Sequence, residues 1–171
     1  MTASPGVTMT TTDHAARIRA DLKRLHGWTS RQVSVRAEYF SLGSSIEIVI
    51  KDPAIPRKAV KAIAEPAERL HRCEITGEIL GGGNRYLSVR YSNEAQAIHG
   101  RRYADAVQRA VNLLEPGSSS LVPVEGTTFL VGLPNAGRIS LWEDSYITDG
   151  YTVDAVAQYI GALMVNRSDA D

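Results

Sequence analysis

The sequence has one cysteine, Cys73, in 171 residues, so it cannot form an internal disulfide. No apolar run approaches the length of a membrane span, and the first residues lack the basic and apolar regions of a signal peptide. The four histidines show no ligand-type spacing to one another or to the cysteine, so we expect neither a metal nor a cofactor. We therefore expect a cytoplasmic protein without membrane contact.

Catalytic signatures are also lacking. No serine lies in a nucleophile-elbow pattern, and Cys73 alternates with Ile75 as a small core residue would. Three glycines at 81–83 lack the lysine and hydroxyl of a P-loop and lead into a strand pattern rather than a helix. The sequence predicts a protein that is not an enzyme.

Net charge is absent as well, since 19 basic side chains balance 19 acidic ones. The balance conceals an asymmetry. Residues 1–110 carry 17 basic and 11 acidic side chains, a surplus of six positive charges, whereas residues 111–171 carry 2 and 8, a surplus of six negative charges. Such a split is typical of a basic binding surface, of two halves that attract each other, or of two ordinary solvated surfaces.

Strand patterns are clearly present. Apolar and polar residues alternate over residues 33–39 and 46–50, and residues 41–44 between them read as a turn. This alternation predicts two half-buried strands joined as an antiparallel hairpin. A second hairpin is predicted over residues 73–92, with its turn at residues 81–84.

Helical spacing of apolar residues accounts for most of the remaining chain. Thr12 or Asp13 is placed to cap the first helix, and Thr152 the last. Pro66 inside the second pattern predicts a kink or two shorter helices. The predicted helices span residues 12–26, 56–70, 94–115 and 153–163.

Together these elements predict an α+β protein. We expect an antiparallel sheet of two main hairpins, with helices packed mainly on one face as a two-layer sandwich, and a C-terminal strand-helix extension. Residues 1–11 are predicted to be a disordered tail, 12–115 the α+β core domain, 116–126 a linker or loop, and 127–171 the extension packed on that core.

The first half resembles a known family over residues 14–93. The resemblance is carried by the tetrapeptides at 33–36 and 43–46, by the Asp-Pro strand end at 52–53, and by the heptapeptide at 86–92. These motifs are similar to the large polyvalent protein-associated domains, closest to the twenty-ninth type. Such domains are carried by phages, plasmids and other mobile elements of bacteria, often beside domains thought to act against host defence. The resemblance implies no active site; the residues that it implies for a binding surface are Ser34, Arg36, Gly43, Ser44, Ser45, Arg90 and Ser92.

The functional prediction that follows is a non-catalytic binding protein of a phage or other mobile element. It would act on a host protein or complex in the bacterial cytosol, and inhibition of a defence system is one action of this kind. The alternative is a nucleic-acid-binding accessory protein that uses the basic N-terminal half. In that case the residues that contact phosphates would be Arg36, Lys51, Arg85 and Arg90.

Two further expectations concern the polar strand faces. Arg36 and Arg90 could share a face and bind an anion, or cross-strand ion pairs with nearby glutamates such as Glu47 could engage them. Among the aromatic residues, Tyr39 and Tyr91 fall in register with the apolar positions and are predicted to be core. The residues left as stacking platforms for bases are Phe40 and Tyr86.

Overall fold

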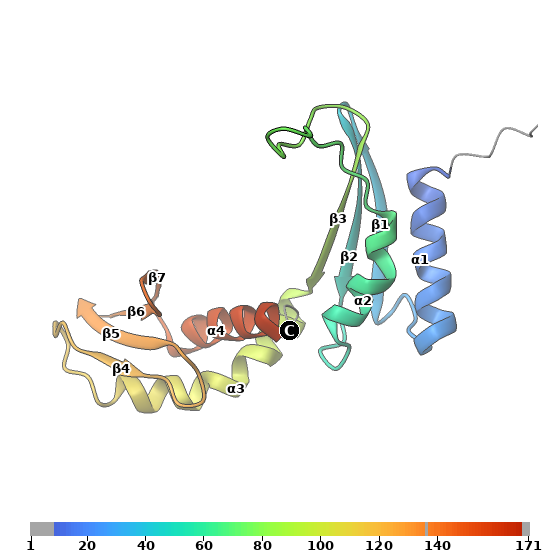
Figure 1. The fold of residues 1–171 in the computed structure, drawn as a ribbon. Coiled ribbons are helices and arrows are strands. Elements are labelled where there is room, and N and C mark those ends of the chain that lie inside the picture. Colours follow the sequence, from blue (N-terminus) through green and yellow to red (C-terminus); the bar gives the residue numbers. More distant parts are fainter. Residues whose placement is uncertain (1–8, 136, 169–171) are drawn as a thin grey trace, which may run out of the picture. The chain divides into compact units, whose positions relative to one another are not determined.

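The structure is a computed structural model that describes residues 9–135 and 137–168. Within these residues it has four α-helices and seven strands in two sheets, which confirms the α+β class (Figure 1). The chain divides into two compact units, Met1–Ser92 and Asn93–Asp171. No helix in the described part is long and apolar enough to cross a membrane.

The first helix begins one residue earlier than the sequence predicts. Thr10 caps the first helix, because its hydroxyl accepts from Asp13 N (3.1 Å) while the Asp13 carboxylate accepts from Thr10 N (2.8 Å). The predicted caps at Thr12 and Asp13 are therefore wrong, and Thr11 is helical rather than part of a tail. The rest of the predicted tail, residues 1–8, lies outside the described residues. The elements of this unit are α1 (Thr11–His26), β1 (Val33–Phe40), β2 (Gly43–Ile50), α2 (Arg57–Ala64), the 3-10 turn η1 (Glu65–Ala67) and β3 (Asn84–Tyr91).

The first sheet has the order β1-β2-β3. The predicted hairpin of β1 and β2 is present and antiparallel, with Val35 opposite Ile48. The second predicted hairpin is wrong, since β3 pairs with β2 in parallel and residues 73–83 form a loop. The connection from β2 to β3 passes through α2, and a crossover of this kind brings the chain back in the same direction. Cys73 is half-buried in that loop, and Ile75 is 95% exposed rather than core.

Both helices of this unit cover the same face of the sheet (Figure 1). The core between the layers contains the fully buried Ile46, Ile48 and Ile50 of β2 together with Ile18 and Leu22 of α1. A two-layer arrangement is thus present in this unit. The helix predicted through Pro66 is divided as expected: α2 ends at Ala64, and the proline lies within η1.

The second unit has more strands than the sequence predicts. The expected strands at 127–132 and 138–142 correspond to β5 and β6, and two further strands extend the sheet to the antiparallel order β4-β5-β6-β7. The chain between 116 and 126 contains β4 rather than only a linker. The elements are α3 (Asn93–Val111), β4 (Leu121–Pro123), β5 (Leu130–Asn135), β6 (Arg138–Trp142), β7 (Tyr146–Gly150) and α4 (Val153–Ser168).

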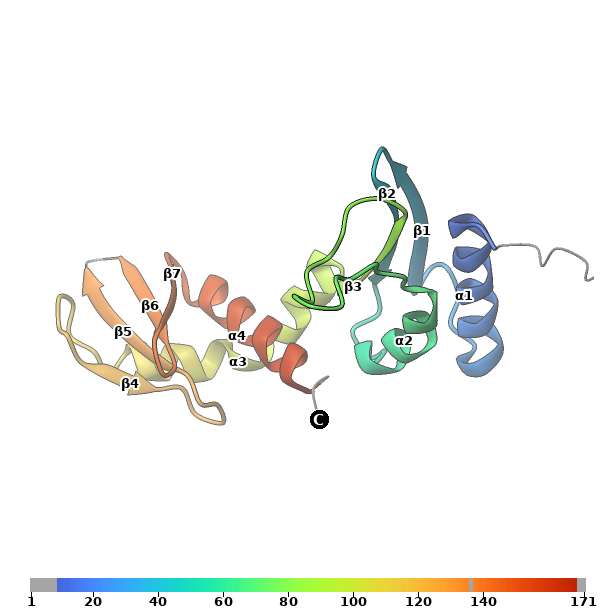
Figure 2. The same ribbon diagram turned by 45° about the horizontal axis from the view of Figure 1, so that its top comes forward.

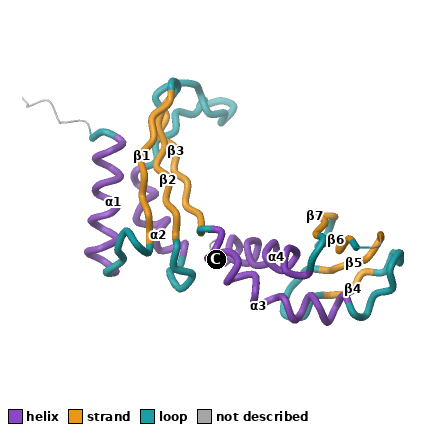
Figure 3. The backbone as a smooth tube through the Cα atoms, turned by 180° about the vertical axis from the view of Figure 1, so that it is seen from behind, coloured by secondary structure: helices purple, strands orange, loops and turns teal. Residues whose placement is uncertain are grey.

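The two helices of the second unit pack against each other (Figures 2 and 3). A Cβ atom placed on Gly161 would lie 2.7 Å from Gly100 N, and one on Gly100 would lie 2.6 Å from Gln158 Cα. Because these neighbours are backbone atoms, only glycine permits so close a crossing. α3 therefore belongs with α4, and the structure divides the chain before α3 instead of at 116–126, where the sequence suggested a linker.

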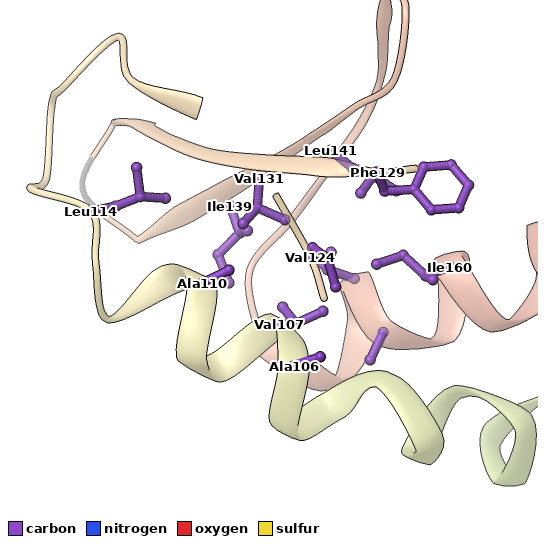
Figure 4. Packing of buried hydrophobic residues seen from close by; sticks show 12 residues of the cluster. Ala106, Val107, Ala110, Leu114, Val124, Phe129, Val131, Ile139, Leu141 and Ile160 are labelled. Atoms are coloured by element: carbon purple, nitrogen blue, oxygen red, sulfur yellow. The ribbon is translucent and has the colours of Figure 1, made fainter. Parts of the chain in front are cut away.

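The core of this unit lies between the helices and its sheet. Side chains from α3, α4 and the strands point toward one another in Figure 4. Phe129, Val131 and Leu141 are fully buried there against Val107 and Ile160. Thr152 caps α4 as predicted, since its hydroxyl accepts from Ala155 N at 3.1 Å.

An ion pair between Arg167 and Glu143 links the C-terminal part of α4 to the end of β6. Arg167 donates to both carboxylate oxygens of Glu143, Thr128 donates to the same carboxylate, and the Arg167 guanidinium lies 4.8 Å from the centre of the Phe129 ring. The hydrogen bonds from Arg167 and then from Thr128 lower the pKa of Glu143 to about 2.

This pKa predicts a pH dependence of stability. A carboxylate whose pKa is lower in the folded state stabilises the fold above its unfolded pKa, about 4.5, and loses that contribution as the pH falls toward 2. At pH 7 we expect Glu143→Gln to lower the melting temperature of the second unit, and we expect its difference from wild type to shrink steadily below pH 4.5. Thermal unfolding of both proteins across this pH range measures the effect.

The matched control is Glu125→Gln, which removes an ion pair with Arg109 whose two side chains are both exposed. It should leave the melting temperature nearly unchanged at every pH. A Glu143→Gln difference that stays constant from pH 7 to pH 2 would contradict the assignment.

Candidate functional site

The candidate site is the face of the first sheet that lies opposite α1 and α2, called the open face here. Alternation along three strands places polar and aromatic side chains on it, because the apolar side chains of the same strands point to the helices. Most of the longer side chains on this face are exposed. Its residues are Ser34, Arg36, Glu38, Phe40, Ser45, Glu47, Val49, Tyr86, Ser88 and Arg90.

The two outer strands carry the same tripeptide, and each presents its serine and its arginine to this face. Ser-Val-Arg occurs at 34–36 in β1 and at 88–90 in β3. Since β1 runs against β2 while β3 runs with it, the two copies run in opposite directions. Arg36 and Ser88 therefore flank Glu47 on β2, and Ser34 and Arg90 flank Val49 one row away.

Only one of these arginines is paired within the described residues. Arg90 donates to Glu47 Oε1 from Nε at 3.1 Å and from Nη2 at 2.8 Å. Arg36 is exposed and makes no hydrogen bond or ion pair with any part of the chain that the structure describes. The sequence left open whether these arginines form cross-strand ion pairs or bind an anion. In the structure Arg90 forms the ion pair, and Arg36 is available to a ligand.

An aromatic pair lies at the turn end of the open face. The rings of Phe40 and Tyr86 are stacked with centroids 6.1 Å apart, and their side chains are 47% and 37% exposed. The adjoining loops add the exposed apolar side chains of Leu42, Ile79 and Leu80. Aromatic residues and arginine are the side chains that contribute most to protein interfaces, so this end has the composition of a binding surface.

The structure does not bring all the predicted site residues together. Ser34, Arg36, Ser45 and Arg90 lie on the open face. Ser44 is buried on the helix-covered face, where its hydroxyl lies 2.7 Å from that of Thr11. Ser92 follows β3, and its amide donates to Ile50 O at 2.8 Å as part of the ladder.

Two further predicted residues have structural roles that the motif did not indicate. Gly43 begins β2 where it passes β3, and a Cβ atom there would lie 2.5 Å from Asn84 O. Arg85 points to the helix-covered face, and its Nη1 donates to Ala67 O at 2.9 Å. Arg85 therefore cannot join Arg36 and Arg90 in one phosphate-binding surface.

The two tyrosines predicted to be core differ in burial. Tyr91 is 6% exposed, and its hydroxyl donates to Ile55 O at 2.8 Å. Tyr39 lies near the end of β1 beyond the core and is 62% exposed, with its hydroxyl 3.1 Å from Thr12 Oγ1. Register alone predicted both as core, but register does not say where along a strand the covering helix ends.

The charge asymmetry of the sequence follows the two units. Residues 1–92 carry 14 basic and 9 acidic side chains, a net charge of +5, and residues 93–171 carry 5 and 10, a net charge of −5. The open face itself is neutral, because Arg36 and Arg90 are balanced by Glu38 and Glu47. No group of three or more metal-binding side chains occurs among the described residues.

Searches with family models, curated proteins and solved structures found no match to this chain.

Proposed function

We propose that this chain is a non-catalytic binding protein of a phage or other mobile element, and that it docks on a host protein through the open face. The setting comes from the resemblance of residues 14–93, and inhibition of a host defence system is an action that fits it. The observation that carries the binding proposal is the neutral, uncovered sheet face with an available Arg36 beside the stacked pair of Phe40 and Tyr86.

Charge supports a protein partner over nucleic acid at this face. A surface that binds phosphates needs an excess of positive charge, whereas here Glu38 and Glu47 cancel the two arginines. A protein surface with one carboxylate for Arg36 and an apolar side chain for the aromatic pair would match the open face.

Affinity capture from bacterial host lysate, with nuclease present, tests the proposal. Wild type is compared with the double variant Phe40→Ser/Arg36→Glu and with Tyr151→Ser, an exposed aromatic of the second unit, as the control. We expect a stoichiometric protein partner with wild type and the control, and its loss with the double variant, because interface aromatics and arginines often contribute about 2 kcal/mol or more each.

Recovery of the same partner by all three proteins would place the interface elsewhere. Loss of every partner after nuclease treatment would overturn protein binding altogether.

Nucleic-acid binding by the first unit is the second candidate, and its net charge of +5 favours it. Electrostatic binding would weaken steeply with salt, by about one power of the salt concentration for each phosphate contact. Fluorescence anisotropy with single-stranded and duplex DNA between low and physiological salt measures this slope. Phe40→Ser should weaken only single-strand binding if bases stack on the aromatic pair.

A further inference from the structure

The sheet of the second unit has two faces, and α3 and α4 pack against one of them. Val122, Val131 and Leu141 lie side by side on that face and belong to the core or pack against it. Because side chains alternate along a strand, the neighbours of these residues point the other way. This second surface is called the outer face here, and its residues are Leu121, Pro123, Leu130, Gly132, Arg138, Ser140, Trp142, Tyr146 and Asp149.

An apolar row crosses the outer face at the end where β6 turns into β7. The strand register places one side chain from each strand in this row, in the order Pro123, Leu130, Trp142 and Tyr146. The rings of Trp142 and Tyr146 meet edge to face with centroids 5.3 Å apart, and Tyr146 is 50% exposed. Strands spaced about 4.8 Å apart make the row about 14 Å long. A continuous exposed apolar surface of this kind marks a site of protein interaction.

The central side chain of the row is fixed in place by its own strand. Trp142 Nε1 donates to Ser140 Oγ at 2.9 Å, so the indole offers a partner apolar surface rather than a hydrogen-bond donor. Leu121 extends the apolar surface toward the next row, because its side chain lies over Gly132 and is still 42% exposed. An indole that is already ordered loses little conformational entropy when a partner binds.

The charge of this sheet is negative. Residues 116–152 carry one basic side chain, Arg138, and four acidic ones, Glu125, Glu143, Asp144 and Asp149, a net charge of −3. Arg138 lies 3.6 Å from Asp149, and Glu125 and Glu143 pair with arginines of the two helices. Asp144 is exposed in the turn between the last two strands and forms no ion pair with any residue that the structure describes. The uncompensated charge beside the apolar row is therefore a carboxylate.

We propose that the outer face binds a segment of another protein in which bulky apolar side chains lie beside lysine or arginine. The apolar side chains pack on Leu130, Trp142 and Tyr146, and the basic ones face Asp144. Nucleic acid is a poorer match for these aromatic rings, because its phosphates would meet negative charge. The outer face belongs to the second unit, so this proposal is independent of docking through the open face of the first.

Fluorescence of Trp142 in the whole chain tests the proposal, because Trp28→Phe leaves it as the sole tryptophan. The probes are three synthetic peptides of equal length, made of leucine and lysine, of leucine and glutamate, and of serine and lysine. At physiological salt we expect the leucine–lysine peptide to shift the emission saturably to shorter wavelength and the other two to leave it unchanged. The proposal is wrong if the leucine–lysine peptide gives no saturable shift, or if either other peptide binds equally well.

Variants in the same background separate the apolar row from general attraction. Tyr146→Ser should raise the Kd for the leucine–lysine peptide about tenfold, the effect of losing an interface aromatic. Tyr159→Ser removes a tyrosine of α4 that is 51% exposed, and it should bind as the parent protein does. Equal weakening by the two variants would contradict a site on the outer face.

The contribution of charge is tested in the same way. Asp144→Asn should raise the Kd about threefold and reduce the dependence of binding on salt, as expected for an exposed charge at the edge of an interface. Asp105→Asn removes an exposed carboxylate from α3, on the other side of the sheet, and should have no effect. Equal effects of both substitutions would mean that net charge alone attracts the peptide, against the proposal.

A second copy of this chain is the other occupant that the same probe detects. The emission of Trp142 should not change with protein concentration when no peptide is present. A shift to shorter wavelength at high protein concentration, with a parallel rise in the sedimentation coefficient, would assign the outer face to self-association and overturn the proposal.

Discussion

Replacement of Gly161 by alanine is expected to destabilise the second unit by about 2 kcal/mol, even though alanine favours helices by about 1 kcal/mol over glycine. The added methyl group would lie 2.7 Å from Gly100 N and 2.8 Å from Gly100 Cα. No rotamer change relieves a contact with backbone atoms, so α3 and α4 would have to separate. Gly161→Val should have a larger effect, because its side chain extends further into α3.

Urea unfolding followed by tryptophan fluorescence measures this effect unit by unit. The chain has two tryptophans, Trp28 in the first unit and Trp142 in the second, so Trp28→Phe leaves a probe in the second unit alone. Gly81→Ala, in a loop of the first unit, is the control: a Cβ atom there would meet nothing within 4 Å, so it should leave the unfolding of the second unit unchanged. A Gly161→Ala protein as stable as wild type would mean that the helices do not cross so closely.

Phe129→Ala is expected to cost the second unit about 3–5 kcal/mol of unfolding free energy. Phe129 is fully buried among Val124, Val131 and Ile160, and the Arg167 guanidinium makes a cation–π contact with its ring. Truncation would leave a cavity at the centre of a small core, where the neighbouring strands can collapse only partly.

The chain contains its own control, because its other phenylalanine is the exposed Phe40. Phe40→Ala should change the unfolding free energy by less than about 1 kcal/mol, and the proposed docking surface should lose affinity instead. The same urea experiment, with the probe in the corresponding unit, compares the two variants. Similar stability losses for both would contradict the burial that the structure assigns.

Local patterns allowed part of this fold to be predicted. The hairpin at 33–50 was predicted correctly because alternation and a short turn act between neighbouring residues. The parallel pairing of β2 with β3 was not, since it depends on where α2 brings the chain back. The same limit applies to α3: its apolar stripe was visible, but the close approach of Gly100 to Gly161 depends on two helices far apart in the sequence.

The residues of the open face could also be predicted only in part. Alternation placed Arg36 and Arg90 on polar faces and left Phe40 and Tyr86 as the exposed rings, and the structure places all four on one surface. The same alternation puts Arg85 in register with Leu87 and Tyr91, so the sequence already indicated that it lies on the opposite face from Arg90.

The paired Ser-Val-Arg tripeptides give the open face an approximate twofold axis that passes through β2 near Ile48. Rotation about that axis exchanges the two serines and the two arginines, so a ligand that contacted only these four side chains would have two equivalent orientations. Glu47 removes the equivalence, since it pairs with Arg90 and leaves Arg36 available. In the proposed docking, the side chain of one glutamate would thus set the direction in which a partner lies across the sheet, and Glu47→Val would permit both directions.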